Sequence, residues 1–325
     1  MKHNTRLLPV FRISALLWSG PVSTLMVGED GERQRQVIER AIERGLNWFD
    51  TAATYGAGQS ETNLGRVLEE LGTGESVHVA TKVRLMPEDL DDIPGFIRQS
   101  VHQSLQRLRL PRITLLQLHN SITPARDDEP TSLTPEDVLG THGIAETFEE
   151  LKASGLVQQI GLTGIGHPDS LAEVVRSGRF ATMQVPYHLL NPSAGRNMPD
   201  DFAETNYGNI IEECAQQQMG VLAIRVMAGG ALADSPPSPH TFKTPFFPLA
   251  LYERDRHRAA QLQNLLRESY SLPQVAVQFA LNHPSIHSAL IGFGEPDQVD
   301  EALAALNTDS PLPDWDELLT SVLTG

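Results

Sequence analysis

Apolar and polar positions along the chain follow two alternating patterns. Short apolar runs of five or six residues indicate buried strands, and segments with apolar residues at helical spacing lie between these runs. The apolar runs predict strands at 13–18, 46–50, 77–82, 113–118, 157–162, 182–186, 221–226 and 286–291. The segments at helical spacing predict helices at 33–44, 61–71, 95–109, 143–154, 170–177, 209–218, 256–269, 273–282 and 297–306.

This alternation of strands and helices predicts a parallel sheet, because each parallel strand needs a crossover connection, usually a helix, before the next strand. Eight such units in one chain predict a closed (β/α)8 barrel that forms a single domain over residues 1–325. An open, doubly wound sheet is the alternative fold. It would need a glycine-rich GxGxxG turn after the first strand, whereas residues 19–24 read SGPVST.

Three connections are too long to be tight turns: residues 120–141, 191–207 and 228–255. They are rich in Pro, Asp, Ser and Thr, and each follows a predicted strand. Loops of more than about 12–15 residues in a compact domain are commonly functional. We therefore expect these loops to cover a substrate at the carboxyl ends of the strands.

Composition and charge exclude several classes of protein. Hydrophobic residues make up 40% of the chain and charged residues 20%, as in ordinary globular proteins. The net charge of −16 argues against nucleic acid or an anionic membrane as a partner. No apolar run approaches the roughly 18 residues of a membrane helix, and Arg12 interrupts the apolar N-terminal stretch. The expected location is therefore the cytoplasm.

Cysteine and histidine usage excludes two further kinds of site. The single cysteine, Cys214, rules out a framework of internal disulfides. The histidines show no HxH or HExxH spacing, so we expect no metal site.

Candidate chemistry lies at the ends of three successive predicted strands. These strands end in Asp50, Lys82 and His119, and Tyr55 follows Asp50 by five residues. If the strands are parallel neighbours, the four side chains meet at one end of the barrel. Taken singly, each residue has an ordinary alternative: a cap or turn for the aspartate, a rim position for the lysine or histidine, and packing for the tyrosine. Their joint occurrence favours a site.

These four side chains suit proton transfer to or from a carbonyl or alcohol oxygen. A free phenol has a pKa near ~10, and a buried lysine beside it stabilises the phenolate and lowers that pKa. An aspartate keeps the lysine charged, and a neutral histidine can orient the reacting oxygen. No side chain supplies hydride, so this chemistry requires a redox cofactor.

The motifs that carry these residues resemble the aldo-keto reductase family. They are GLNWFDTAATYG, VATK and LLQLH, followed in the first case by the helix start SETNLGRVL. The resemblance implies a (β/α)8 barrel, a nicotinamide cofactor and no metal. It also implies that Tyr55 is the general acid/base, that Lys82 and Asp50 tune it, and that His119 orients the substrate. The segment LAIRVMAGGAL resembles sequences of the bacterial aldose and galactose dehydrogenase-like branch of the family.

The resemblance also implies where the cofactor binds, with several departures from the family pattern. The usual Ser-Asn pair that holds the carboxamide is replaced by Thr163 and Gly164, and the usual Tyr-Ser by Ile224 and Arg225. Arg225 would contact the pyrophosphate or the substrate, or form a salt bridge in the barrel. The full set of expected cofactor contacts is Thr163, Gly164, Gln184, Ile224, Arg225, Gly292, Gly294, Glu295, Gln298 and Glu301.

The segment after the last strand favours NAD over NADP. No Lys or Arg follows Arg267, and Glu295 stands where basic residues would hold a 2′-phosphate. Glu295 would instead accept hydrogen bonds from the free ribose hydroxyls, unless it points to solvent and a distant basic residue serves the phosphate.

The sequence thus predicts an NAD- or NADP-dependent oxidoreductase that interconverts an aldehyde, ketone or aldose with an alcohol or lactone. The alternative is a cofactor-binding sensor or regulatory subunit with little turnover.

Overall fold

The computed structural model describes residues 5–7, 12–14, 16–19, 25–74, 76–236, 249–266, 270–306 and 314–324. Within these ranges, eight strands close into a barrel in which every neighbouring pair is parallel, in the order β10-β3-β4-β5-β6-β7-β8-β9. The barrel strands are β3 (Leu16–Ser19), β4 (Trp48–Asp50), β5 (His78–Val83), β6 (Ile113–Leu118), β7 (Val157–Thr163), β8 (Thr182–Pro186), β9 (Gly220–Ile224) and β10 (Ile286–Ile291). The predicted (β/α)8 barrel is confirmed.

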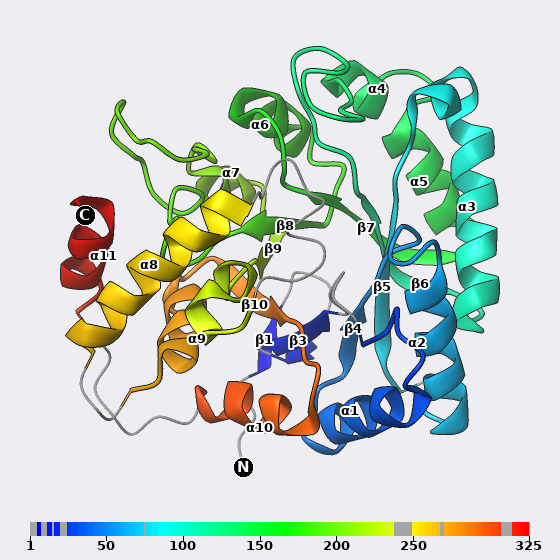
Figure 1. Ribbon diagram of the computed structural model, residues 1–325. Coiled ribbons are helices and arrows are strands. Elements are labelled where there is room, and N and C mark those ends of the chain that lie inside the picture. The colour runs from blue at the N-terminus through cyan, green and yellow to red at the C-terminus, as the bar shows by residue number, and fades with distance from the viewer. Residues whose placement is uncertain are drawn as a thin grey trace.

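Helices surround the strands, with α1 to α3 on one side and α8 and α11 on the other (Figure 1). Their bounds are α1 (Gly31–Glu43), α2 (Gln59–Glu70), α3 (Ile93–Leu108), α4 (Pro135–Leu139), α5 (Ile144–Ala153), α6 (Pro168–Arg176), α7 (Ile210–Gln216), α8 (Leu249–Leu265), α9 (Leu272–Asn282), α10 (Pro296–Ala304) and α11 (Trp315–Thr324). In α1, residues Val37, Ile38 and Ala41 face the core, and Asp30 caps the first turn by accepting from Arg33 N at 3.0 Å.

The extent of the first predicted strand, 13–18, is wrong, because the barrel strand covers only its second half. The chain forms two strands there, β2 (Arg12–Ser14) and β3, and β2 pairs antiparallel with β1 (Thr5–Leu7) outside the barrel. Hydrophobic periodicity reports which residues are buried, but it does not report where a strand changes its partner.

The predicted loop 228–255 is also only partly a loop. It contains a 3-10 segment, Ala228–Ala233, that is kinked at Gly229 and Gly230, and its last residues belong to α8. Residues 237–248 lie outside the described residues, as do residues 267–269 of the predicted helix 256–269. The short helix α4, at the end of the loop 120–141, and the last helix, α11, had no sequence prediction.

Side chains inside the barrel change from apolar to polar toward the carboxyl ends of the strands. A buried apolar cluster fills the lower level, and it consists of Trp48, Ala80, Leu115, Leu222 and Leu290, with Ile224 packed against it. Because strand side chains alternate between two faces, the residue two positions later points the same way. On β4, β5 and β6 those residues are Asp50, Lys82 and Gln117. The site therefore lies directly above an apolar layer.

Helix α2 packs closely against α3 through Gly65. A Cβ atom at this position would lie 2.5 Å from the carbonyl oxygen of Arg107 and 2.6 Å from that of Leu108. Only glycine allows this approach, so α2 lies where its first turn can reach the ends of β4 and β5.

Candidate active site

A buried ion pair joins the ends of two neighbouring strands. Lys82 Nζ lies 2.5 Å from Asp50 Oδ1 and donates a second hydrogen bond of 2.8 Å to the carbonyl oxygen of Thr51. The side chains of Lys82 and Asp50 are 1% and 4% exposed. Water therefore screens this attraction little, and the two charges determine the electrostatics around them.

Two amides complete the surroundings of the Asp50 carboxylate. Gln184 Nε2 donates to Asp50 Oδ2 at 2.6 Å, and Gln117 Nε2 donates to the same oxygen at 3.3 Å. Burial raises the pKa of Asp50, while Lys82 and the two amides favour its charged form. Burial lowers the pKa of Lys82, but Asp50 and Tyr55 outweigh it, so this pKa lies above its ordinary value. Lys82 is therefore a cation at neutral pH.

Tyr55 lies beside this ion pair. Lys82 Nζ is 5.0 Å from the centroid of the Tyr55 ring, and the ring meets His119 edge-on with centroids 5.7 Å apart. Burial raises the pKa of Tyr55, Lys82 lowers it, and Asp50 raises it again, so the pKa lies above its ordinary value. The sequence analysis predicted correctly that Lys82 lowers the pKa of Tyr55. It did not include the opposite effect of burial, which is larger. The phenol therefore holds its proton at neutral pH.

The fourth residue, His119, follows β6. Its Nδ1 atom lies 3.3 Å from Thr54 Oγ1, on the segment that also carries Tyr55. The structure thus brings Asp50, Tyr55, Lys82 and His119 together at the carboxyl ends of β4, β5 and β6. Their catalytic roles stay predictions.

The residues expected to hold the nicotinamide lie on the next strands. Thr163 ends β7 with its Oγ1 buried and without a hydrogen-bond partner among the described residues, which suits an acceptor such as a carboxamide. A Cβ atom at Gly164 would lie 2.8 Å from Met183 Cε, so no larger residue fits there without movement. Gln184 donates its amide to Asp50, and its contact with the cofactor stays a prediction. Ile224 is partly exposed above the apolar cluster and can pack against a flat ring.

Arg225 follows β9 with a left-handed backbone, φ 58°. It interacts with Tyr207, from the loop 191–207, and with Asp255 of α8. Burial lowers the pKa of Arg225, and Tyr207 and Asp255 oppose this effect. These contacts lie within the protein, and a contact of Arg225 with the pyrophosphate or the substrate stays a prediction. Nearby, burial lowers the pKa of His188 to about 3, so this imidazole is neutral.

The segment after β10 turns directly into α10. Gln298 Oε1 accepts from Gly294 N at 2.7 Å and from Glu295 N at 3.3 Å, so Gln298 closes the turn. Glu295 accepts a 2.7 Å hydrogen bond from Arg33 Nη1 of α1. Gly292 and Glu301 are exposed.

Two polar residues at the site, Gln117 and Thr51, had no role in the sequence analysis. Gln117 contacts Asp50, and the backbone of Thr51 accepts from Lys82. The one available signal was a glutamine at an inward position of the mostly apolar run ITLLQL. A polar side chain is costly there unless it has a partner.

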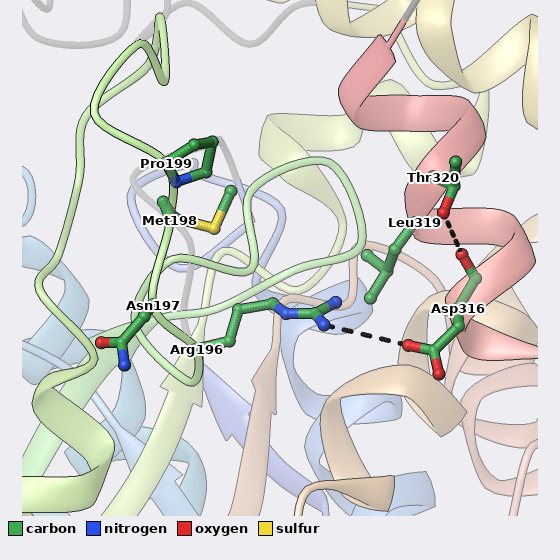
Figure 2. A pocket seen from close by; sticks show the side chains of 7 residues that line it. All are labelled: Arg196, Asn197, Met198, Pro199, Asp316, Leu319 and Thr320. Carbon is green, nitrogen blue, oxygen red and sulfur yellow. Dashed lines mark hydrogen bonds and ion pairs between the residues drawn. The ribbon is translucent and has the colours of Figure 1, made fainter.

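A pocket of about 240 Å³ lies away from these residues, between α11 and the start of the loop 191–207 (Figure 2). Arg196 Nη2 lies 3.8 Å from Asp316 Oδ1 across it, and Thr320 Oγ1 donates to Asp316 O at 2.7 Å. Its lining residues are Arg196, Asn197, Met198, Pro199, Asp316, Leu319 and Thr320. Asp50, Tyr55, Lys82 and His119, called the four strand-end residues below, do not line this pocket.

The described residues contain neither a membrane-spanning helix nor a cluster of metal ligands. No helix there is long and apolar enough to cross a membrane. No group of three or more His, Cys, Asp or Glu side chains in the same part of the chain is arranged to hold a metal ion.

Comparisons with known proteins agree with this architecture. The model of the Aldo/keto reductase family matches residues 28–318. The D-threo-aldose 1-dehydrogenase of Pseudomonas sp is 29% identical over 309 residues, which cover 87% of this chain and 85% of that protein. The holo form of aldo-keto reductase AKR11C1 from Bacillus halodurans superposes with a TM-score of 0.72 at 21% identity, covering 98% of this chain and 96% of that chain. The glycerol dehydrogenase AKR11B4 from Gluconobacter oxydans also gives 0.72 at 21% identity, covering 100% and 96%.

Proposed function

Because the chain belongs to the aldo/keto reductase family, we propose that it is an NAD(P)-dependent oxidoreductase with Tyr55 as the general acid/base. It interconverts an aldehyde, ketone or aldose with the corresponding alcohol or lactone. One observation carries this proposal: the buried pair of Lys82 and Asp50 places a cation 5.0 Å from the centroid of the Tyr55 ring. A sensor with little turnover would not need this costly burial of charge beside a phenol.

Each residue has a role that follows from its contacts. In the reductive direction, the Tyr55 hydroxyl donates a proton to the carbonyl oxygen, and Lys82 stabilises the phenolate that remains. Asp50 keeps Lys82 charged in its buried position. His119, which contacts Thr54 through Nδ1, orients the substrate oxygen. The nicotinamide supplies the hydride and would be held by Thr163, Gly164 and Ile224.

The proposed substrate class is an aldose or another small polyhydroxy carbonyl compound. The name of the Pseudomonas relative describes an aldose dehydrogenase, and the loops around the site are rich in polar residues. These loops suit a ligand with many hydroxyl groups better than an aromatic or steroid ligand.

The proposed cofactor is NAD in preference to NADP. Arg33 is paired with two carboxylates, Glu295 at 2.7 Å and Asp30 at 3.3 Å. One positive charge beside two negative charges leaves a local excess of negative charge. A 2′-phosphate, which carries close to two negative charges, would meet repulsion there.

An absorbance screen for the reduced nicotinamide tests the proposal. The purified protein is mixed with NADH or NADPH and a panel of aldehydes and ketones, and in reverse with NAD or NADP and a panel of aldoses. We expect turnover in at least one direction, and its loss in Tyr55→Phe. Cofactor binding without turnover on either panel would favour the sensor alternative.

A further inference from the structure

The first turn of α2 lies outside the barrel and contacts three of the four strand-end residues. It contacts the backbone of Tyr55 directly, and it contacts Asp50 and Lys82 through the residues next to them in the chain. Ser60 N donates to the carbonyl oxygen of Tyr55 at 3.2 Å. The hydroxyls of Ser60 and Thr51 share a hydrogen bond of 2.8 Å. Thr51 directly follows Asp50, and its carbonyl oxygen accepts from Lys82. Ser60 therefore links the segment that holds Asp50 to the segment that holds Tyr55.

Glu61 makes the corresponding link to β5. Its side chain is completely buried, and its Oε1 atom accepts a 2.5 Å hydrogen bond from Thr81 Oγ1. Its other oxygen, Oε2, accepts from Arg107 Nε of α3 at 2.6 Å. Thr81 is the residue immediately before Lys82 in the chain.

The two faces of a strand explain why these outer contacts act on the inner site. Successive residues of β5 point to opposite sides, so Thr81 points toward α2 while Lys82 points into the barrel. A hydrogen bond that fixes Thr81 therefore also fixes the backbone from which Lys82 extends. In the same way, the bond between Thr51 and Ser60 fixes the carbonyl that Lys82 contacts.

The energetics indicate a role beyond packing. Desolvating a buried carboxylate is unfavourable, and an apolar pair of the same volume is often as stable as a buried ion pair. Glu61 meets this cost with two short hydrogen bonds, one to the strand and one to the neighbouring helix. Gly65, one turn further along α2, brings the helix close enough to α3 for these bonds to form.

We propose that Ser60 and Glu61 are positioning residues that set the placement of Lys82 relative to Tyr55, through Thr51 and Thr81. This inference rests on the proposed function, in which the lysine stabilises the phenolate. Neither residue touches the substrate in this proposal. Their effect on the reaction passes entirely through the geometry of the four strand-end residues.

Thr81→Val tests the link to Glu61, because valine keeps the shape of threonine and removes the hydroxyl. Thr81→Ser should restore the hydrogen bond and act as the rescue variant. Thr51→Val tests the link to Ser60 independently, in case the first variant does not fold. Glu69→Gln is the matched control, since Glu69 of α2 also pairs with an arginine, Arg109 at the end of α3, but its side chain is 63% exposed.

The first readout is kinetic. In Thr81→Val and Thr51→Val, kcat should fall about tenfold while the dissociation constant of the cofactor changes little, because a small misplacement affects the chemical step most. Thr81→Ser and Glu69→Gln should keep kcat within about twofold of the wild type. Unchanged kcat in both valine variants would overturn the proposal.

The second readout does not depend on activity. The phenolate absorbance of Tyr55 is obtained as the difference between each protein and its Tyr55→Phe counterpart, at one alkaline pH where circular dichroism shows all proteins folded. The titratable groups facing Tyr55 are Lys82, Asp50 and His119. A displaced Lys82 should lower the phenolate fraction about threefold in the valine variants. An equal fraction in wild type and valine variants would refute the positioning role, whereas a wild type without turnover would refute only the proposed function.

Discussion

Lys82 Nζ lies 5.0 Å from the centroid of the Tyr55 ring, and this cation opposes the effect of burial on the phenol. Burial is the larger effect, so the pKa of Tyr55 lies above its ordinary value. The protein therefore carries a protonated phenol across the neutral range, ready to donate. Removing a proton from an alcohol requires the phenolate, so oxidation should gain rate as the pH rises.

Replacing Tyr55 by Phe should abolish most turnover while the site keeps its shape. The substitution removes only the hydroxyl, so the dissociation constant of the cofactor should stay near the wild-type value. We expect kcat to fall by about 10²–10⁴-fold. Steady-state kinetics together with a fluorescence titration of the cofactor checks this. A variant with near-normal kcat would show that another group transfers the proton.

Replacing Lys82 by Met should move the alkaline dependence of oxidation. Without the cation, burial and Asp50 both act to raise the pKa of the phenol, so the pKa of Tyr55 rises further. The pH at which the oxidation rate reaches half its maximum should increase by about one unit or more. Lys152→Met is the control, because Lys152 lies on the surface of α5, where its Nζ donates to Gln159 Oε1 at 3.0 Å. The same pH profile in Lys82→Met and the control would contradict this account.

The strand-end residues were predictable because each short apolar run stops at a charged or titratable side chain. Asp50, Lys82 and His119 could thus be placed at one end of a barrel from chain order alone. The contact of Gln184 with Asp50 could not, because it depends on the register of strands 134 residues apart. The division of residues 12–19 into two strands was hidden for a related reason, since burial does not reveal the pairing partner.

The pairing of Arg33 with Glu295 also escaped the sequence, because 262 residues separate the two. It leads to a prediction about cofactor choice. Glu295→Gln should leave Arg33 with one carboxylate partner instead of two, so a 2′-phosphate could compete for the guanidinium. We expect the ratio of kcat/KM for NADP to that for NAD to increase about tenfold.

The control for this change is Asp297→Asn, which removes the same charge from the first turn of α10 at a position without an ion pair in the described structure. It should alter the cofactor ratio much less. An equal shift in both variants would mean that Glu295 acts only through long-range charge. No shift in Glu295→Gln would place the 2′ position elsewhere.

Asp255 should make the stability of the protein depend on pH. Burial, followed by the nearby Glu204, raises the pKa of Asp255 to about 6 despite the neighbouring Arg254 and Arg258. A carboxyl whose folded-state pKa is raised stabilises the fold at low pH, and this contribution is lost as the pH rises toward the folded value. The loss should therefore occur between about pH 4 and about pH 6.

Urea unfolding of the wild type and of Asp255→Asn across this range checks the prediction. The free energy of unfolding of the variant, relative to the wild type, should increase with pH by about 2–3 kcal/mol. Glu253→Gln removes an exposed carboxylate two residues earlier on α8. Its free energy of unfolding relative to the wild type should stay nearly constant across this range. A constant difference in Asp255→Asn as well would mean that its carboxyl titrates normally in the folded protein.

The apolar cluster below the site limits the route by which ligands enter and leave the barrel. Trp48, Leu115 and Leu222 are buried within the barrel, so the interior is closed at that level. The cofactor and the substrate of the proposed reaction would then both enter and leave at the carboxyl ends of the strands. A ligand that lay between this cluster and a second ligand would have to bind first and leave last, and its release could then limit the rate of turnover.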